Sequence, residues 1–216
     1  MPSSLDPAAA RILDDLSPVK RLSRPWRRAV PAVLLGLLMA AGVYLRLGVR
    51  DDGGVLGGTV LWGLSALQMA YGILLIAEAL RSAVPGRVPR GKPLGLLLLA
   101  GGGVVVSVTF LTWLVHATHV PTGRDVLYWT LCTRTPVAIG LPALVLTLVL
   151  AFRAYPTHPV LTGALAGLGA GLISDGSWRT YCEVSDPVHV FTSHTASVLL
   201  LLVAGMGLAW IAARRH

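Results

Sequence analysis

Charged residues are scarce in this sequence. Of its 216 residues, 13% are charged and 54% are hydrophobic, whereas a soluble domain carries about 25% charged residues. This shortage excludes a single water-soluble core. Because one membrane span needs about 20 mainly apolar residues, we predict an all-α fold, a polytopic membrane helix bundle.

Cysteine is also scarce, and the usual catalytic motifs are missing. The two cysteines, Cys132 and Cys182, lie far apart in the sequence, which excludes a CxxC motif and a zinc signature with closely spaced ligands. HExxH, GxSxG, P-loop and paired-carboxylate motifs do not occur. We therefore predict that the chain is not an enzyme and has no resident cofactor.

Six apolar runs are separated by short polar segments. We divide the chain into a cytoplasmic N-terminal tail, residues 1–28, and a six-helix transmembrane domain, residues 29–216. The apolar runs predict six transmembrane helices, at residues 30–47, 55–80, 94–115, 126–152, 159–173 and 188–213.

Lysine and arginine are distributed unequally around these runs. The formal net charge is +8, and most of the basic residues fall in the tail, in the segment 81–92 and at the C-terminus. Cytoplasmic loops of membrane proteins carry an excess of Lys and Arg. The distribution therefore predicts that both ends of the chain lie in the cytoplasm (N-in/C-in).

Proline and glycine mark the fourth and fifth predicted spans. Pro136 and Pro142 each remove a helix hydrogen bond, which predicts a broken helix that serves either as a packing kink or as a hinge. Gly163, Gly167 and Gly171 recur at every fourth position and share one helix face, so they predict helix packing across a smooth surface. The packing partner is left open between a helix of this chain and a second copy.

The tail contains a short amphipathic segment with apolar residues at helical spacing. A helix this short is not stable alone in water, so it needs the membrane surface or a groove on a soluble partner. The acidic pair Asp14 and Asp15 favours a basic protein partner over an anionic lipid surface. The predicted contact residues are Leu5, Ile12, Leu13 and Leu16.

Side chains that bind metals or react with oxidants gather at the predicted outer face. Three interpretations stay open: a structural disulfide between Cys132 and Cys182, a redox or thiol sensor formed by the same pair, and a metal site that adds His189 to them. The gathered residues are Cys132, Cys182, Glu183, Asp186, His116, His119, His189 and His194.

Glu78 is an acidic residue inside an apolar run. Buried carboxylates in a membrane are candidates for function, but the closeness of Arg81 in the sequence favours an ion pair at the inner edge. We expect no other charge in the middle of the membrane, which counts against an ion pump or a proton-coupled transporter.

Three parts of the sequence resemble a known family. They are the juxtamembrane segment DDLSPVKRLSRPWRR (Asp14–Arg28), the Gly/Ala-rich stretch TGALAGLGAGLISDGSWRTYCEVSDPVHVF (Thr162–Phe191), and Cys132 with the two prolines that follow it. In their order and spacing they resemble the NrsF-type family of six-span membrane anti-sigma factors, the negative regulators of sigma F. The resemblance covers nearly the whole chain.

The resemblance implies a protein that holds an extracytoplasmic-function sigma factor inactive at the bacterial inner membrane. A periplasmic stress signal, in some members heavy-metal stress, releases the sigma factor. Cys132 and Cys182 are similar to the sensing thiols of the family, and transient metal binding at them is left open. The implied partners are the sigma factor and the lipid bilayer, without direct nucleic-acid contact; a homo-oligomer is left open. The family often has a histidine directly before the loop cysteine, where this chain has Tyr181.

Two other classes of function stay open. A small membrane transporter or metal-handling protein would use the outer Cys/His residues and bind metal stoichiometrically. A structural subunit would scaffold a larger complex. The shortage of polar residues in the middle of the runs makes the transporter the weaker interpretation.

Overall fold

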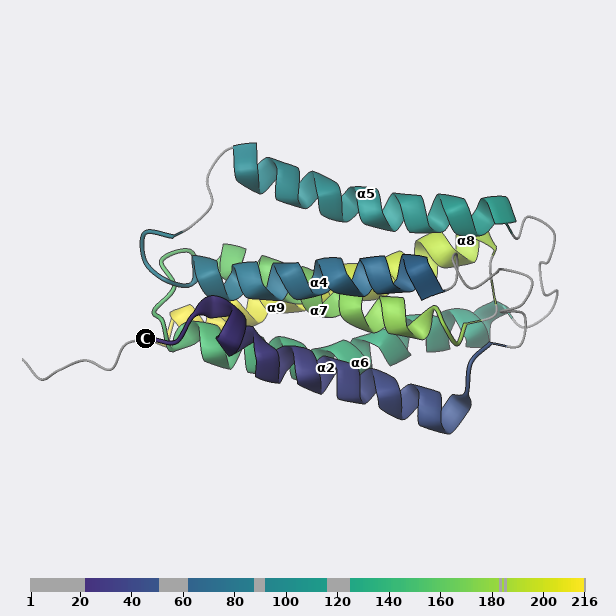
Figure 1. Cartoon of the computed structure of the whole chain (residues 1–216), viewed down its shortest axis with the longest axis horizontal. Helices are drawn as coiled ribbons and strands as arrows, with labels where there is room; N and C mark the ends of the chain where they lie inside the picture. The colour runs from purple at the N-terminus through teal and green to yellow at the C-terminus, as the bar shows by residue number, and fades with distance from the viewer. Residues whose placement is uncertain are drawn as a thin grey trace, which may run out of the picture.

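The computed structural model describes residues 22–50, 62–87, 92–115, 125–182, 184 and 186–215. Within these ranges the fold is all-helical and has no strand, which confirms the predicted class. A short helix, α8 (Pro187–His189), and a π-helical segment, η2 (Val190–His194), lead into the last helix (Figure 1). The long helices are α2 (Pro25–Leu47), α4 (Leu64–Ser82), α5 (Lys92–Val115), α6 (Asp125–Phe152), α7 (Pro159–Trp178) and α9 (Thr195–Ala213).

Each long helix corresponds to one of the predicted apolar runs. α2 begins at Pro25, so the last residues of the predicted tail already belong to it; proline suits the first helical turn, where its missing N–H has no partner in any case. α7 continues past the predicted end at residue 173 as far as Trp178. The predicted start of the second run, residue 55, lies outside the described residues.

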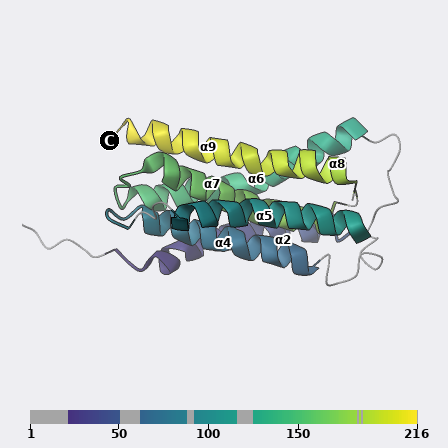
Figure 2. The same ribbon diagram turned by 90° about the horizontal axis from the view of Figure 1, so that it is seen from above.

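Successive long helices run in opposite directions along the bundle (Figures 1 and 2). The start of α2 at Pro25 and the end of α9 at Ala213 therefore lie at the same end of the molecule, which we call the terminal end. The end of α2 at Leu47 and the start of α8 at Pro187 lie at the opposite end, which we call the site end. This arrangement places the two ends of the described chain together.

Five helices of the described chain are long and apolar enough to cross a membrane. α7 is the long helix that does not belong to this set. Six spans and the N-in/C-in orientation therefore stay predictions, while the bundle as a whole is compatible with membrane insertion. The five segments are Pro25–Leu47, Leu64–Ser82, Pro93–Leu111, Trp129–Phe152 and Val190–Ala213.

α7 forms the centre of the bundle. It packs against α4, α6 and α9, and most of its residues from Thr162 onward are buried. Its Leu165 and Leu172 join Leu75 of α4 and Leu201 of α9 in the main apolar core. α5 lies at the periphery, beside α4 (Figure 1). A helix so enclosed can carry small and polar side chains that a lipid-facing helix cannot, because its neighbours supply their partners.

Glycines bring α7 close to α9. A Cβ atom on Gly163 would lie 2.2 Å from the carbonyl oxygen of Gly205, and one on Gly167 would lie 2.2 Å from that of Leu201. Gly171 also faces α9. The glycine stripe therefore packs against a helix of the same chain, and the small residues allow the two backbones to approach directly.

α6 runs through both of its prolines as one continuous helix of 28 residues. The predicted break at Pro136 and Pro142 is therefore not an interruption of the helix. Each proline lacks an N–H, so a carbonyl one turn earlier loses its partner. Membrane helices tolerate this loss because neighbouring groups and small local adjustments satisfy the backbone.

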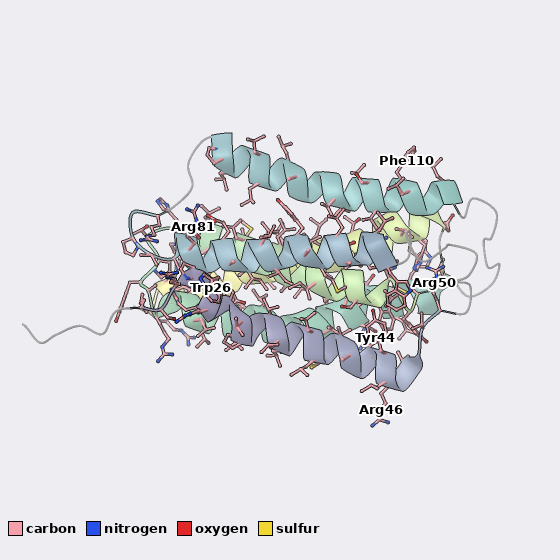
Figure 3. All side chains as sticks on the ribbon, in the orientation of Figure 1. Trp26, Tyr44, Arg46, Arg50, Arg81 and Phe110 are labelled. Carbon is pink, nitrogen blue, oxygen red and sulfur yellow. The ribbon has the colours of Figure 1, made fainter. Side chains whose placement is uncertain are left out.

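Glu78 and Arg81 form the ion pair that the sequence predicts. The Arg81 Nε lies 2.6 Å from Oε2 of Glu78, and the Arg81 side chain is 48% exposed. Figure 3 shows Arg81 at the terminal end. Because the pair reaches the surface at the end of α4, it needs no functional explanation.

Candidate functional site

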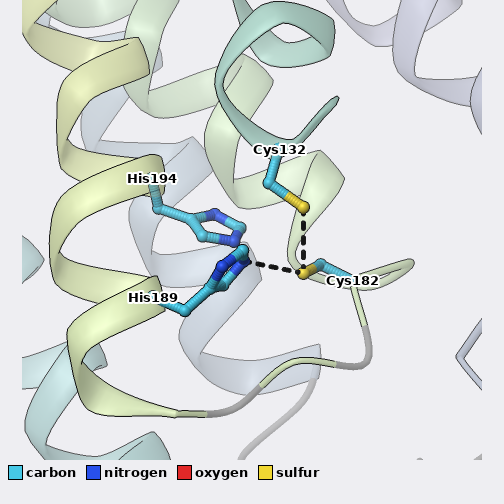
Figure 4. Close-up of side chains that lie close together, drawn as sticks. All are labelled: Cys132, Cys182, His189 and His194. Atoms are coloured by element: carbon cyan, nitrogen blue, oxygen red, sulfur yellow. Dashed lines mark hydrogen bonds between the residues drawn. The ribbon is translucent and has the colours of Figure 1, made fainter. Parts of the chain in front are cut away.

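Two cysteines and two histidines converge at the site end of the bundle (Figure 4). Cys132 comes from α6, Cys182 from the loop after α7, His189 from the end of α8 and His194 from the end of η2. All four side chains are buried, and their ligand atoms lie within 4.8 Å of one another. These residues form one compact group, which we call the Cys/His cluster.

Both cysteines are free thiols. Their Sγ atoms lie 3.3 Å apart, compared with about 2.05 Å in a disulfide. The Cys182 Sγ also lies 3.6 Å from Nε2 of His189. Contact with Cys132 and burial both raise the pKa of the Cys182 thiol.

The π-helical segment η2 explains how His189 and His194 meet. Residues of an α-helix rotate by about 100° each, so side chains five positions apart point about 140° away from each other. A π-helix makes hydrogen bonds between residues i and i+5, which places such residues one turn apart on the same face. The two imidazole rings consequently lie edge to face, with 5.6 Å between their centroids.

Asp186 fixes the start of this segment. Its carboxylate Oδ2 accepts a hydrogen bond from the backbone N–H of His189 at 2.8 Å, the interaction by which an acidic side chain caps the first turn of a helix. The cap therefore holds the backbone of His189 at the start of the segment that carries both histidines.

Asp175 of α7 lies directly behind His194. Its Oδ1 is 2.6 Å from Nδ1 of His194. Its Oδ2 accepts hydrogen bonds from Nε2 of Gln68 on α4 at 2.7 Å and from Nε of Arg179 at 3.0 Å. Asp175 is only 1% exposed, and a carboxylate so deeply buried needs several partners to stay charged.

A buried charge pair lies just beyond the predicted end of the fifth run at residue 173. α7 extends beyond residue 173, so Asp175 lies within the helix, and Arg179 one turn later balances its charge. Asp175 and Arg179 are four residues apart, the spacing of an ion pair within a helix. This spacing could have predicted that the helix continues past residue 173. Gln68 is a second signal, since a polar side chain in an apolar run requires a partner.

Apolar and aromatic side chains enclose the Cys/His cluster. Trp178 and Ile139 are buried together with the two cysteines, and the Trp129 ring meets His189 edge to face at 5.8 Å. Tyr181, which precedes Cys182, packs on Trp178 with 4.8 Å between ring centroids. Because burial limits access to a thiol, the enclosure restricts the cluster to small molecules and ions.

The structure brings together all three residues of the predicted metal set, Cys132, Cys182 and His189, and adds His194 to them. Sequence reasoning placed His194 in the same region without assigning it a role, because the π-helical turn that aligns it with His189 has no sequence signature. The predicted sigma-factor contacts and part of the outer group lie outside the described residues: Leu5, Ile12, Leu13, Leu16, His116, His119 and Glu183.

Comparison with known protein families assigns the chain. A family model described as negative regulator of sigma F (NrsF) matches residues 13–214, a range that includes the Cys/His cluster and all six long helices. Among curated proteins and solved structures, no match is found. The match over nearly the whole chain confirms the resemblance, and the chain belongs to the NrsF family, the negative regulators of sigma F.

Proposed function

We propose that the chain is a membrane-embedded anti-sigma factor. It sequesters an extracytoplasmic-function sigma factor at the inner membrane and releases it when a periplasmic stress signal reaches Cys132 and Cys182. Membership of a regulator family supports a non-enzymatic role. The observation that carries the proposal is the division of the bundle, with a buried Cys/His cluster at the site end and both described ends of the chain at the terminal end.

The distribution of arginine supports a cytoplasmic terminal end. Arg81 lies at that end, whereas Arg46 and Arg50 lie at the site end (Figure 3). Basic residues are concentrated on the cytoplasmic side of membrane proteins, so in this proposal the site end faces the periplasm. The other arginines near the terminal ends of the long helices are Arg24, Arg27, Arg28, Arg87, Arg153, Arg214 and Arg215.

We assign the sigma-factor contact to the tail and to the segment 81–92, which adjoin the terminal end. An amphipathic helix that docks its apolar face into a groove is a common way of binding a soluble partner. The side chains proposed for this contact are Leu5, Ile12, Leu13 and Leu16.

Two connections lead from the Cys/His cluster toward the terminal end. α6 carries Cys132 and continues through Pro136 and Pro142 to Phe152. In addition, Asp175 is hydrogen bonded to Gln68 of α4, the helix that ends next to Arg81. Coupling between distant sites needs an element with two arrangements, and α6, with two prolines inside the helix, is our candidate.

Co-purification tests the partner. The full-length chain, solubilised in detergent, is expected to retain the sigma factor encoded by the neighbouring gene, and the tagged sigma factor is expected to retain the chain. An unrelated sigma factor of the same cell serves as the control. If neither direction shows association, the proposed function is wrong.

Serine substitutions test the sensor. Cys132→Ser and Cys182→Ser are expected to keep the sigma factor bound but to abolish induction of its regulon under metal stress. Thr130→Ser, at an exposed position on the same turn of α6, is the control and should respond normally. An unchanged response in both cysteine variants would leave the thiols with a structural role only.

A further inference from the structure

We propose that Cys132, Cys182, His189 and His194 bind one divalent d¹⁰ cation such as Zn²⁺ as a closed four-ligand site, in which Asp175 positions His194. This inference deepens the proposed sensor function and rests on it for its regulatory meaning, but the binding itself is a property of the bundle. The cluster supplies two thiols and two imidazoles, which is the ligand set of many tetrahedral zinc sites.

The distances fit a tetrahedral cation. With bonds of about 2.3 Å to sulfur and about 2.0 Å to nitrogen, two sulfur ligands lie about 3.8 Å apart, and a sulfur and a nitrogen about 3.5 Å apart. The two Sγ atoms are 3.3 Å apart, and Sγ of Cys182 is 3.6 Å from Nε2 of His189. The sulfur atoms therefore need to separate by only about 0.5 Å to admit the cation.

The surroundings of His194 are those of a metal ligand. Its Nδ1 is held by the Asp175 carboxylate at 2.6 Å, so Nε2 is the nitrogen that remains for the cluster. A carboxylate on the far nitrogen of a ligating histidine fixes the ring and increases its basicity, and the loss of such a group costs about 10–100-fold in metal affinity. Gln68 and Arg179 in turn hold Asp175.

His189 is an unusual buried histidine unless it has a ligand. It is 2% exposed, and its Nδ1 has no hydrogen-bond partner among the described residues. Its Nε2 faces the cluster, 3.6 Å from the sulfur of Cys182. An imidazole whose ring nitrogens donate no hydrogen bond to a described carboxylate or carbonyl can bind a cation through Nε2.

The charges favour a divalent cation. Metal binding takes a proton from each thiol, so two thiolates and one Zn²⁺ make a neutral group in an apolar enclosure. Asp175 and Arg179 already balance each other. Hard cations such as Mg²⁺ prefer oxygen ligands, which the cluster does not supply. Four protein ligands leave no open position for a substrate, so the site binds and does not catalyse.

Zinc titration of the full-length chain tests the site. The reduced, metal-free protein in detergent is titrated with Zn²⁺ against a chromophoric chelator, and one ion per chain is expected. Cys132→Ser and His194→Gln should weaken binding at least 100-fold. His158→Gln, an exposed histidine at the N-terminus of α7, is the matched control and should leave the affinity unchanged.

The role of Asp175 has its own readout. Asp175→Asn, measured on the monodisperse fraction, should lower the Zn²⁺ affinity about 10–100-fold, and Asp175→Glu should recover part of the loss. X-ray absorption of the wild-type complex should show two sulfur and two nitrogen ligands, a result that does not depend on any variant folding. Equal Zn²⁺ affinity of the wild type and Asp175→Asn would show that Asp175 does not position His194 for metal binding.

Three results would overturn the site: no Zn²⁺ bound at micromolar concentration, binding that His158→Gln weakens as much as His194→Gln, or a spectrum without sulfur ligands. Binding of Cu⁺ but not Zn²⁺ would overturn the assignment to a divalent ion. Zinc binding without sigma-factor co-purification would contradict only the proposed function. Co-purification without zinc binding would contradict only this inference.

Discussion

Asp175 is hydrogen bonded to three polar partners in a part of the bundle where an unpaired buried charge would be strongly destabilising. Arg179 supplies the opposite charge, and Gln68 and His194 complete the hydrogen bonds. Removing one member of a buried ion pair leaves the other without compensation, which costs more than the pair itself contributes. The carboxylate therefore stabilises the junction of α4, α7 and η2 and at the same time orients a side chain of the Cys/His cluster.

Neutralising this carboxylate should destabilise the protein strongly. Asp175→Asn leaves Arg179 buried without a counter-charge, and we expect a loss of about 3–5 kcal/mol in the free energy of unfolding, measured by thermal or denaturant unfolding in detergent. Glu78→Gln, which breaks the partly exposed pair with Arg81, should cost less than about 1 kcal/mol. Equal losses in the two variants would contradict the account of Asp175.

The sequence predicted some residues of the site and missed others for identifiable reasons. Cys132 and Cys182 were placed at one face by counting spans, but that count could not say that their sulfur atoms meet. His194 was noticed without a role, since its alignment with His189 depends on a π-helical turn. Asp175 was missed because its charge ended the apolar run, whereas in the folded chain its partners on α4 and η2 let α7 continue.

At the scale of single elements, the contact between α7 and α9 depends on backbone approach. A Cβ atom on Gly163 would clash with the carbonyl oxygen of Gly205 on α9, and one on Gly167 would clash with that of Leu201. Such contacts replace side-chain packing with dispersion between backbones. The position of α9 matters for the site because η2, with His194, leads directly into it.

Adding one methyl group at this contact should force α7 and α9 apart. In Gly205→Ala the new Cβ would lie 2.3 Å from the carbonyl oxygen of Gly163, and overpacking of this kind costs about 1–3 kcal/mol. Gly207→Ala on the same helix adds a Cβ with no atom within 4 Å and should be neutral or slightly stabilising. The comparison is made by unfolding in detergent, and similar behaviour of the two variants would refute the close approach.

α6 is the element that we expect to transmit the signal. Pro136→Ala and Pro142→Ala restore N–H donors and should make the helix more rigid. The sigma factor should remain bound, while induction of its regulon should fall several-fold in a reporter assay. Pro93→Ala, in the first turn of the peripheral α5, is the control. Normal induction in both α6 variants would show that α6 does not transmit the signal.

The helices themselves were the most predictable elements. Long apolar runs leave few alternatives to helices in a membrane, because every backbone polar group must be satisfied internally. The central position of α7 was not predictable, because its glycines indicated close helix packing but did not indicate which helix is the partner. Gly205 and Ala209 of α9, which complete the contact, are also small residues four apart, but this spacing does not indicate which helix they face.

At the scale of the whole molecule, the alternating helices place Pro25 and Ala213 at one end and the Cys/His cluster at the other (Figure 1). A regulator that reports across a membrane needs this separation. In the proposed topology the arginines at the terminal end lie on the cytoplasmic side, as the positive-inside rule predicts. The separation of the two ends follows from the fold.

Accessibility of introduced cysteines should reveal the orientation. In a chain carrying Cys132→Ser and Cys182→Ser, Val49→Cys at the site end should react with a membrane-impermeant maleimide added to the periplasmic side. Arg214→Cys at the terminal end should react only after the membrane is opened. Both positions are exposed. The reverse pattern of labelling would invert the proposed topology.

The proposed function requires that this chain holds its sigma factor at the membrane. The most direct test is the distribution of the sigma factor encoded by the neighbouring gene between the membrane and cytoplasmic fractions of unstressed cells. We predict that the sigma factor is in the membrane fraction when the full-length chain is present and moves to the cytoplasmic fraction when the chain is deleted. The same distribution in both strains would contradict the account.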